Sequence, residues 1–260
     1  MNICIIGCGK MGSGIATQLA KHSGHHLTVF DLHQQRCREL ANQIGARCCP
    51  DVSEAVSRAE MIILAVKPRD LDEVAGMIHR ELYEEQLLIS ILTGVSRERL
   101  QTYFANIPIV RIMPNLALLY GKAVVGIANA EDLSPALKEK TLDVLQHLGS
   151  CHWIPESQID ALTAITGSGP AFLFVIIESI IDAGIAMGFS SEEARHLALE
   201  MITGAVVLLK ETGKHPAELK WDVASPAGAT VAGLEAMERH SVRSGVIQTF
   251  LSAFQRAKNM

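Results

Sequence analysis

The stretch NICIIGCGKMG, residues 2–12, decides the fold of this chain. It joins a short apolar run to three glycines in the spacing G-x-G-x-x-G. In a strand–turn–helix unit such glycines permit a tight turn, close approach of the backbone to a pyrophosphate and close packing of helix on strand. The spacing predicts a dinucleotide site; the alternative is a glycine-rich turn without a ligand. The residues of the predicted site are Gly7, Gly9, Lys10, Met11 and Gly12.

A second apolar run, HLTVFD, ends at Asp31, nineteen positions after Gly12. A carboxylate at this point accepts hydrogen bonds from the adenosine ribose hydroxyls and repels a 2′-phosphate. Asp31 therefore favours NADH over NADPH as cofactor. His33 and Arg36 stand nearby and offer a cation for a phosphate, so NADPH stays an alternative. Without a ligand, Asp31 is a solvated acid at a strand end.

Short apolar runs and amphipathic segments alternate over residues 1–154. Continuous apolar strands between helices are typical of a parallel sheet covered on both faces, and right-handed crossovers make such a sheet doubly wound. We expect an α/β fold whose residues 1–154 form a Rossmann-type dinucleotide-binding domain. The expected strands are NICIIG, HLTVFD, AEMIILAV, QLLISIL and IPIVRIM, with KAVVGIA and CHWI as further candidates on either side of a helix.

From residue 155 onward the strand patterns stop and long helical patterns follow. The segment GPAFLFVIIESIIDAGIAMG is apolar around most of its circumference, so it must be buried on more than one side. A helical domain of this size buries little by itself. We therefore expect residues 155–260 to form an all-helical substrate-binding and dimerisation domain in a homo-oligomer built from dimers.

Composition and charge exclude several classes of protein. Apolar residues make up 48% of the chain and charged residues 20%, which indicates a globular protein, and the net charge of −5 argues against a nucleic-acid partner. The apolar run AFLFVII meets Glu178 well before a membrane span is complete, so no membrane partner is expected. The amino terminus lacks a basic leader, which predicts a cytoplasmic protein whose six cysteines stay thiols, with no metal site.

Five further motifs stand in one order along the chain: LAVKP (64–68), RIMPN (111–115), TGSGPAF (166–172), GKHPAELK (213–220) and SPAGAT (225–230). In this order and spacing the chain resembles the pyrroline-5-carboxylate reductases over essentially its whole length. The resemblance implies an oxidoreductase that transfers hydride from NADH or NADPH to C5 of L-1-pyrroline-5-carboxylate, giving L-proline in the last step of proline biosynthesis. It also implies a homo-oligomer built from dimers.

The resemblance places the site residues as well. On the cofactor side it implies Ala65, Val66, Lys67, Pro68, Thr93, Gly94 and Asn115. On the substrate side it implies Glu156, Gly228, Ala229 and Thr230, with Thr230 as the catalytic residue. A protonated cyclic imine is already an electrophile, so the chemistry requires orientation rather than a nucleophile or a metal.

The small residues of SPAGAT fit a small substrate that touches backbone. At a helix start they would leave the amides of Gly228, Ala229 and Thr230 uncovered for a carboxylate, and the Thr230 hydroxyl would meet the ring nitrogen. The alternative is a helix start near Pro226 that packs against a neighbouring helix.

Four positions depart from the family pattern and leave room for altered affinity or a related imine. Leu116 and Ala117 stand where Thr-Pro is usual, and Val52 stands where Asn is frequent. Ala227 replaces the usual Gly of SPAGAT, which predicts a backbone φ below zero there.

Two rival functions remain open from the residues alone. A β-hydroxyacid dehydrogenase uses a Lys on its long helix, whereas this sequence has no Lys from Ser168 to Leu209. The other rival is a non-catalytic dinucleotide-sensing protein with the same fold.

Overall fold

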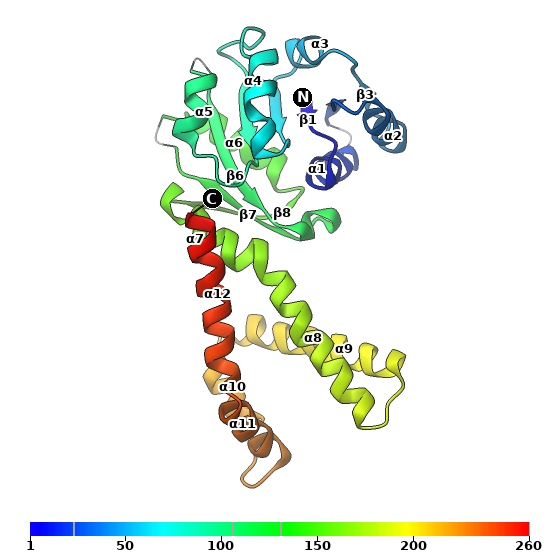
Figure 1. Ribbon diagram of the computed structural model, residues 1–260, viewed down its shortest axis with the longest axis vertical. Coiled ribbons are helices and arrows are strands. Elements are labelled where there is room, and N and C mark those ends of the chain that lie inside the picture. The colour runs from blue at the N-terminus through cyan, green and yellow to red at the C-terminus, as the bar shows by residue number, and fades with distance from the viewer. Residues whose placement is uncertain (23, 106, 131, 260) are drawn as a thin grey trace. The chain divides into compact units, whose positions relative to one another are not determined.

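The computed structural model describes residues 1–22, 24–105, 107–130 and 132–259. The chain divides into two compact units (Figure 1). The first unit is Met1–Gly167 together with the chain from Phe254 onward, and the second is Ser168–Ala253. The domain boundary expected at residues 154 and 155 remains a prediction.

An eight-stranded sheet forms the centre of the first unit, with strand order β3-β2-β1-β4-β5-β6-β7-β8. The order from β3 to β6 is that of a doubly wound dinucleotide-binding fold, so the expected α/β fold is confirmed. The strands are β1 (Asn2–Ile6), β2 (His26–Phe30), β3 (Arg47–Cys48), β4 (Met61–Leu64), β5 (Leu87–Ser90), β6 (Ile109–Pro114), β7 (Ala123–Ala128) and β8 (Gly149–Ile154).

Neighbouring strands are parallel except β6 and β7, which pair antiparallel with Met113 opposite Gly126. The reversal follows from a short connection, the 3-10 helix η2 (Leu116–Tyr120), which ends at Gly121 with φ +66°. A connection this short joins only antiparallel strands. The sequence predicted β7 and β8 as strands but not the direction of β7.

Helices cover both faces of the sheet. The side chains of Ile3 and Ile5 pack with those of α1 (Lys10–Ala20), α2 (Gln34–Ile44) and α6 (Pro135–Leu145) on one face. Cys4 and Ile6 pack with α3 (Val52–Ser57), α4 (Leu71–Ile78) and α5 (Arg97–Tyr103) on the other. Because successive strand residues point to opposite faces, a strand covered on both sides must be apolar along most of its length, as β1, β4 and β5 are.

The second unit is built of helices, and a further helical stretch leads into it from the first unit. The leading stretch is η3 (Glu156–Gln158), α7 (Ile159–Leu162) and a π-helical turn η4 (Thr163–Ser168). The unit itself contains α8 (Gly169–Ala186), α9 (Ser191–Thr212), α10 (Pro216–Asp222) and α11 (Ala229–Arg239), and α12 (Val242–Lys258) returns from it to the first unit.

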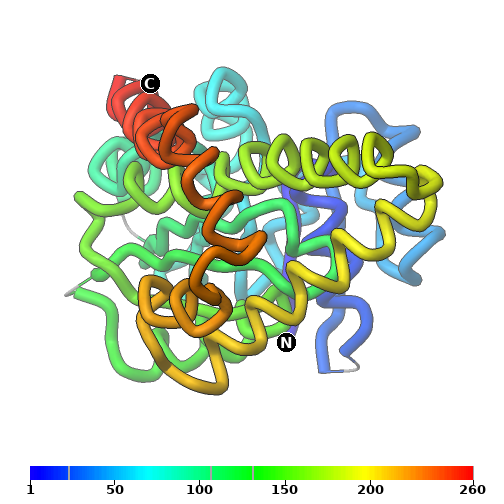
Figure 2. The backbone as a smooth tube through the Cα atoms, turned by 90° about the horizontal axis from the view of Figure 1, so that it is seen from below, coloured from blue at the N-terminus to red at the C-terminus, as the bar shows by residue number. Residues whose placement is uncertain are grey.

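Helices α8 and α9 form a hairpin around Gly188, whose φ is +104° (Figure 2). Helix α9 begins at a reciprocal capping box formed by Ser190 and Glu193. Near the turn the two helices approach closely: a Cβ built on Gly184 would lie 2.9 Å from that of Ala194.

Helix α8 exposes large apolar side chains in the single chain, among them Phe174 at 60% and Val175 at 61%. The continuous helical stretch Glu156–Ala186 contains an 18-residue window with a mean hydropathy of 1.8 and is long and apolar enough to pass for a membrane span by length and composition. The sequence had suggested that Glu178 interrupts the run too early for that. An apolar helix surface of this extent requires a cover, from lipid or from another protein surface.

The expectation that all six cysteines stay thiols is wrong for one pair. Cys37 on α2 and Cys48 on β3 form a disulfide, with their Cα atoms 5.7 Å apart. Helix α2 ends at Gly45, whose left-handed backbone (φ +70°) turns the chain back along the helix into β3. This reversal brings together two residues eleven positions apart, which spacing alone did not reveal.

Three histidines gather where the end of α1 meets the end of α6. The rings of His22 and His147 stack with centroids 3.6 Å apart, and His25 meets His147 edge-on at 5.8 Å. Burial lowers the pKa of His25, helped by the charged amino terminus of Met1, and burial with His22 lowers the pKa of His147. Asp143 acts on both in the opposite direction.

These shifts predict that acid destabilises the fold. A histidine whose folded pKa lies below its unfolded value contributes stability above pH ~6.5 that is lost as the pH falls below it. Because both side chains are substantially solvated, we expect a loss below about 1 kcal/mol. Urea unfolding between pH 8 and pH 5.5 measures it. The variant His147→Gln should flatten the dependence, and an unchanged profile in that variant would contradict the assignment.

Candidate cofactor and substrate site

The glycine turn after β1 packs directly against the ends of two neighbouring strands. Gly7 has φ +102°, and its amide donates to the Phe30 carbonyl at the end of β2 over 2.8 Å. A Cβ built on Gly7 would lie 2.7 Å from the carbonyl oxygen of Ala65, just after β4. Glycine is therefore required by both backbone conformation and space.

The other two glycines have different surroundings. A Cβ on Gly12 would lie 1.8 Å from the Gly7 carbonyl oxygen, so Gly12 is needed for packing within the protein. A Cβ on Gly9 would meet nothing within 4 Å. Gly9 is the N-cap of α1, where unpaired amides and the helix dipole attract an anion. The open side of Gly9 fits the pyrophosphate of a dinucleotide.

Asp31, at the carboxyl end of β2, is fixed by backbone amides. Its Oδ2 accepts from the amide of Cys8 over 2.7 Å, and its Oδ1 accepts from the amide of His33 over 2.8 Å. The guanidinium of Arg36 lies 3.7 Å from Oδ2. An ionised carboxylate has about four acceptor positions, so two remain for the hydroxyls of a ribose.

A pocket of about 290 Å³ opens at this edge of the sheet. Six predicted residues line it: Gly7, Gly9, Asp31, Ala65, Val66 and Lys67. Lys10, Met11, Gly12 and Pro68 are their chain neighbours and lie outside its lining. Arg69, Asp70 and Val74 also line the pocket, and the sequence analysis did not predict them. Their position shortly after the LAVKP motif could have indicated that they lie at this site.

A larger cavity of about 520 Å³ lies at the opposite edge, at the amino ends of β1 and β2. In open α/β sheets ligands bind outside the carboxyl ends of the strands. We therefore assign the cofactor to the pocket at Asp31. Among the described residues, no cluster of three or more His, Cys, Asp or Glu side chains is placed to hold a metal ion.

Three predicted cofactor residues follow the next strands at the same edge. Thr93 and Gly94 come after β5, where Gly94 has φ +73°. Asn115 comes directly after β6, and its side chain has protein partners: Nδ2 donates to the Thr166 carbonyl over 2.9 Å, and Oδ1 accepts from the Val124 amide over 3.2 Å. Asn115 thus ties β6 to β7 and to the π-helical turn, and its contact with a cofactor stays a prediction.

Glu156 belongs to an ion-pair network around the buried Arg111 that the sequence did not reveal. Its Oε1 accepts from the Arg97 amide over 2.8 Å and from the Arg111 guanidinium over 3.0 Å. Arg111, 5% exposed on β6, also lies 4.0 Å from Asp160. Glu156 lies in the first unit and Thr230 in the second, so their action on one substrate stays a prediction.

The stretch SPAGAT forms a tight turn into α11. The amide of Gly228 donates to the Ser225 carbonyl over 3.0 Å, so it is engaged within the turn rather than uncovered as expected. A Cβ on Gly228 would lie 2.4 Å from the Ser225 hydroxyl oxygen. Gly228 is the N-cap and supplies no side-chain cap, which leaves the first-turn amides of Ala229 and Thr230 for an anion.

The expectation of a negative φ at Ala227 is wrong. Its φ is +54°, a left-handed conformation that favours glycine. The turn closed by the Gly228–Ser225 hydrogen bond imposes this conformation whichever residue stands there. A glycine at this position, which the resemblance implies, would adopt this conformation without strain, whereas Ala227 bears strain.

We expect Ala227→Gly to stabilise the chain by about 0.5–1 kcal/mol, because relief of the left-handed strain exceeds the added entropy of the unfolded chain. Thermal or urea unfolding of the purified protein checks this. Gly228→Ala is the matched control and should destabilise through its clash with Ser225. A loss of stability in Ala227→Gly would show that the turn does not impose the conformation.

Comparison with known proteins agrees with this geometry. Residues 156–260 match the family model described as pyrroline-5-carboxylate reductase dimerisation. Residues 2–94 match the model described as NADP oxidoreductase coenzyme F420-dependent. The pyrroline-5-carboxylate reductase of Methanosarcina acetivorans is 34% identical over 265 residues, covering 99% of this chain and 97% of that protein.

Solved structures extend the likeness to the fold of the whole chain. The Streptococcus pyogenes 1-pyrroline-5-carboxylate reductase has a TM-score of 0.90 and 27% identity, with 100% of this chain and 99% of that one covered. The Plasmodium falciparum pyrroline carboxylate reductase with NADP bound has a TM-score of 0.88 and 28% identity, with 100% and 97% covered. Full-length identity above 30%, both family models and the glycine turn lead to one conclusion: this chain belongs to the pyrroline-5-carboxylate reductase family.

Proposed function

We propose that this chain reduces L-1-pyrroline-5-carboxylate to L-proline, the last step of proline biosynthesis, with NADH preferred over NADPH. The observation that supports the reaction is the full-length likeness to pyrroline-5-carboxylate reductases. Use of a nicotinamide dinucleotide is further supported by the Plasmodium relative with NADP bound and by the pocket beside Gly9. The preference for NADH rests on Asp31, which backbone amides fix in the pocket.

The residues of this chain act by binding and orientation. The amino end of α1 and the open side of Gly9 hold the pyrophosphate, and Asp31 accepts the ribose hydroxyls. The amides of Ala229 and Thr230 bind the substrate carboxylate, and the Thr230 hydroxyl orients the ring nitrogen. The bound cofactor supplies the hydride.

Oxidation of NADH in the presence of pyrroline-5-carboxylate tests the function directly. We expect turnover of ordinary enzymatic size, ~1 s⁻¹ or above, with proline as the product. Turnover of a β-hydroxy acid instead would favour the dehydrogenase rival. Binding of NADH without turnover of either substrate would favour the dinucleotide-sensing rival.

Asp31→Ser should shift the preference from NADH toward NADPH by about 1–2 kcal/mol in relative kcat/KM. One hydrogen bond to the ribose is lost and the repulsion of a 2′-phosphate is removed. Steady-state kinetics with both cofactors measure the ratio. A wild-type enzyme that clearly prefers NADPH would overturn the assignment and point to Arg36 or Arg69, which line the same pocket.

We further propose that helices of the carboxy-terminal region contain the dimer contact, in a cytoplasmic enzyme. The match of residues 156–260 to a dimerisation model supports an oligomer built from dimers. A second copy of the chain would then cover the exposed apolar side chains of α8, such as Phe174. Light scattering should give at least a dimer at micromolar concentration. A fully active monomer would contradict this assembly.

A further inference from the structure

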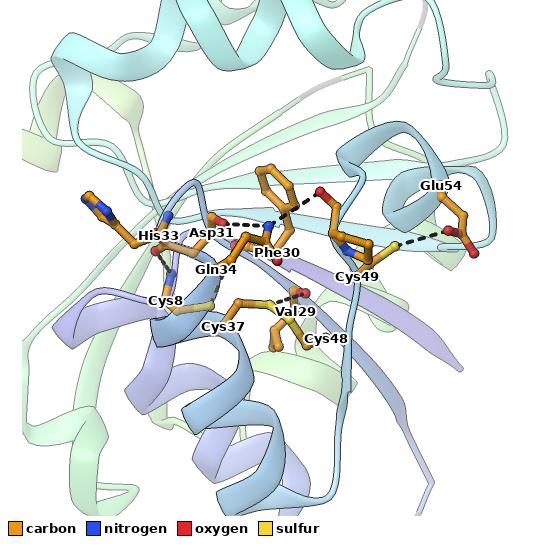
Figure 3. The surroundings of a disulfide bond; sticks show 11 residues. Cys8, Val29, Phe30, Asp31, His33, Gln34, Cys37, Cys48, Cys49 and Glu54 are labelled. Atoms are coloured by element: carbon orange, nitrogen blue, oxygen red, sulfur yellow. Dashed lines mark hydrogen bonds between the residues drawn. A yellow bond between two sulfur atoms is a disulfide. The ribbon is translucent and has the colours of Figure 1, made fainter.

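The Cys37–Cys48 disulfide joins α2 to β3 beside β2, the strand that leads to Asp31 (Figure 3). Cys37 is fully buried in the first turns of α2, the helix that begins three residues after Asp31. Its neighbour Arg36 faces the Asp31 carboxylate at 3.7 Å. Cys48 belongs to β3, at the edge of the sheet.

The edge strand β3 is short and has one neighbouring strand. It pairs with β2 at Arg47 opposite Thr28 and Cys48 opposite Val29, and besides the disulfide it is held by the Cys49 amide, which donates to the Val29 carbonyl over 3.1 Å, and by the Arg47–Glu54 ion pair. A two-residue edge pairing is marginal by itself. Gln34 links the segment after β3 to the pocket: its Nε2 donates to the Asp31 carbonyl over 3.3 Å and to the Pro50 carbonyl over 3.4 Å. A shift of β3 and the residues that follow it would therefore move Gln34 and change its contact with the Asp31 carbonyl.

Two other cysteines near this pair are poor candidates for exchange. Burial and the charge of Asp31 raise the pKa of Cys8 to about 12. Burial likewise raises the pKa of Cys49, which is fully buried beside Glu54. Both are free thiols in the structure, whereas Cys37, which is equally buried, is held against Cys48. Cys48 is half-buried and is the accessible member of its pair.

We propose that Cys37 and Cys48 form a reversible redox site that sets the affinity of the Asp31 pocket for its dinucleotide. Oxidation is an exchange with a small-molecule disulfide. The Cys48 thiolate attacks that disulfide, forms a mixed disulfide and releases one thiol. The Cys37 thiolate then attacks the Cys48 sulfur and releases the second thiol. The two protons of the protein thiols leave with the two released thiols, so atoms and electrons balance.

The direction of the effect follows from what the bond connects. The disulfide joins α2 to β3 and so holds Arg36, Gln34 and Asp31 in one arrangement. Reduction removes the covalent link between α2 and β3, and the side chains of Arg36 and Gln34 then take more than one arrangement around Asp31, which the Cys8 and His33 amides still hold. The apparent affinity for NADH is then the intrinsic affinity multiplied by the fraction of chains in the binding-competent arrangement. A reversible pair of this kind also fits a reducing compartment, where lasting disulfides are rare and sensing ones occur.

The experiment uses the full chain and NADH binding without substrate. The protein is oxidised with glutathione disulfide or reduced with a phosphine, and NADH is titrated anaerobically by fluorescence. We expect reduction to weaken binding about fivefold, the lower end of the usual coupling between sites. Mass spectrometry should show the loss of two hydrogens and a peptide linking Cys37 to Cys48. Cys48→Ser and Cys37→Ser should bind like the reduced protein in either condition. Cys151→Ser, on β8, is the matched control and should respond like wild type.

The inference rests on the proposed cofactor site, and the outcomes separate the two. Equal NADH affinity of the oxidised and reduced wild type would overturn the redox site and leave the function intact. So would a redox response that persists in Cys48→Ser, or failure of the linked peptide to form. No binding of NADH in either state would overturn both. The wild-type comparison needs no variant, so a variant that fails to fold does not weaken the test.

Discussion

Gly12→Ala is expected to lower the free energy of unfolding by about 3 kcal/mol or more and to abolish measurable NADH binding. The new methyl group would lie 1.8 Å from the Gly7 carbonyl oxygen and 3.1 Å from the Ala65 Cβ. The closest of these atoms is backbone, so no side-chain rotation relieves the clash. Helix α1 must move away from β1, in the middle of the packed sheet. Urea unfolding and NADH titration of the purified variant check both effects.

Gly9→Ala is the matched variant, because a methyl group there meets nothing within 4 Å. We expect a cost in stability of about 0.5–1 kcal/mol, since Ala is a poorer N-cap than Gly. NADH affinity should nevertheless fall roughly tenfold or more, because the methyl group occupies the side on which the pyrophosphate approaches the backbone. Unchanged NADH affinity in Gly9→Ala would show that the cofactor does not lie on this turn. Wild-type stability in Gly12→Ala would show that α1 packs more loosely than the structure has it.

The fold was largely predictable because a buried parallel sheet leaves a local signature. Strands covered on both faces are continuously apolar, so β1, β4 and β5 were evident from sequence. The two-residue β3 and the six-residue α3 were missed, since segments this short have no measurable period. The antiparallel direction of β7 depends on the connection through η2, and strand composition carries no such information.

Some features of the candidate site were likewise predictable from the sequence, and others were not. Gly7 and Asp31 were predictable from the pattern because each follows directly after a strand, and the ends of parallel strands meet at one edge, whereas Ala65 was implied by the family resemblance. The pairing of Arg111 with Glu156 joins residues 45 positions apart and has no local pattern. Two further features depend on how the chain turns back on itself, and the sequence did not reveal them. They are the disulfide between Cys37 and Cys48 and the positive φ of Ala227.

Thr230→Val should reduce kcat/KM by about 1.5–3 kcal/mol, the size of a lost hydrogen bond to a charged nitrogen. Thr230 is the second residue of α11, where Val keeps the branched shape and removes the hydroxyl. The first-turn amides are unchanged by this substitution, so the substrate carboxylate keeps its partners. NADH affinity should stay at the wild-type value, because Gly9 and Asp31 belong to the other unit.

Thr230→Ser is the control that separates the hydroxyl from the shape of the side chain. It restores the hydroxyl with a smaller side chain, so it should recover most of the activity lost in Thr230→Val. If both variants lose activity equally, the packing of the Thr230 methyl group matters and not its hydrogen bond. If Thr230→Val retains wild-type turnover, the hydroxyl has no part in orienting the imine. The turn before α11 would then act on the substrate through the backbone amides of Ala229 and Thr230 alone.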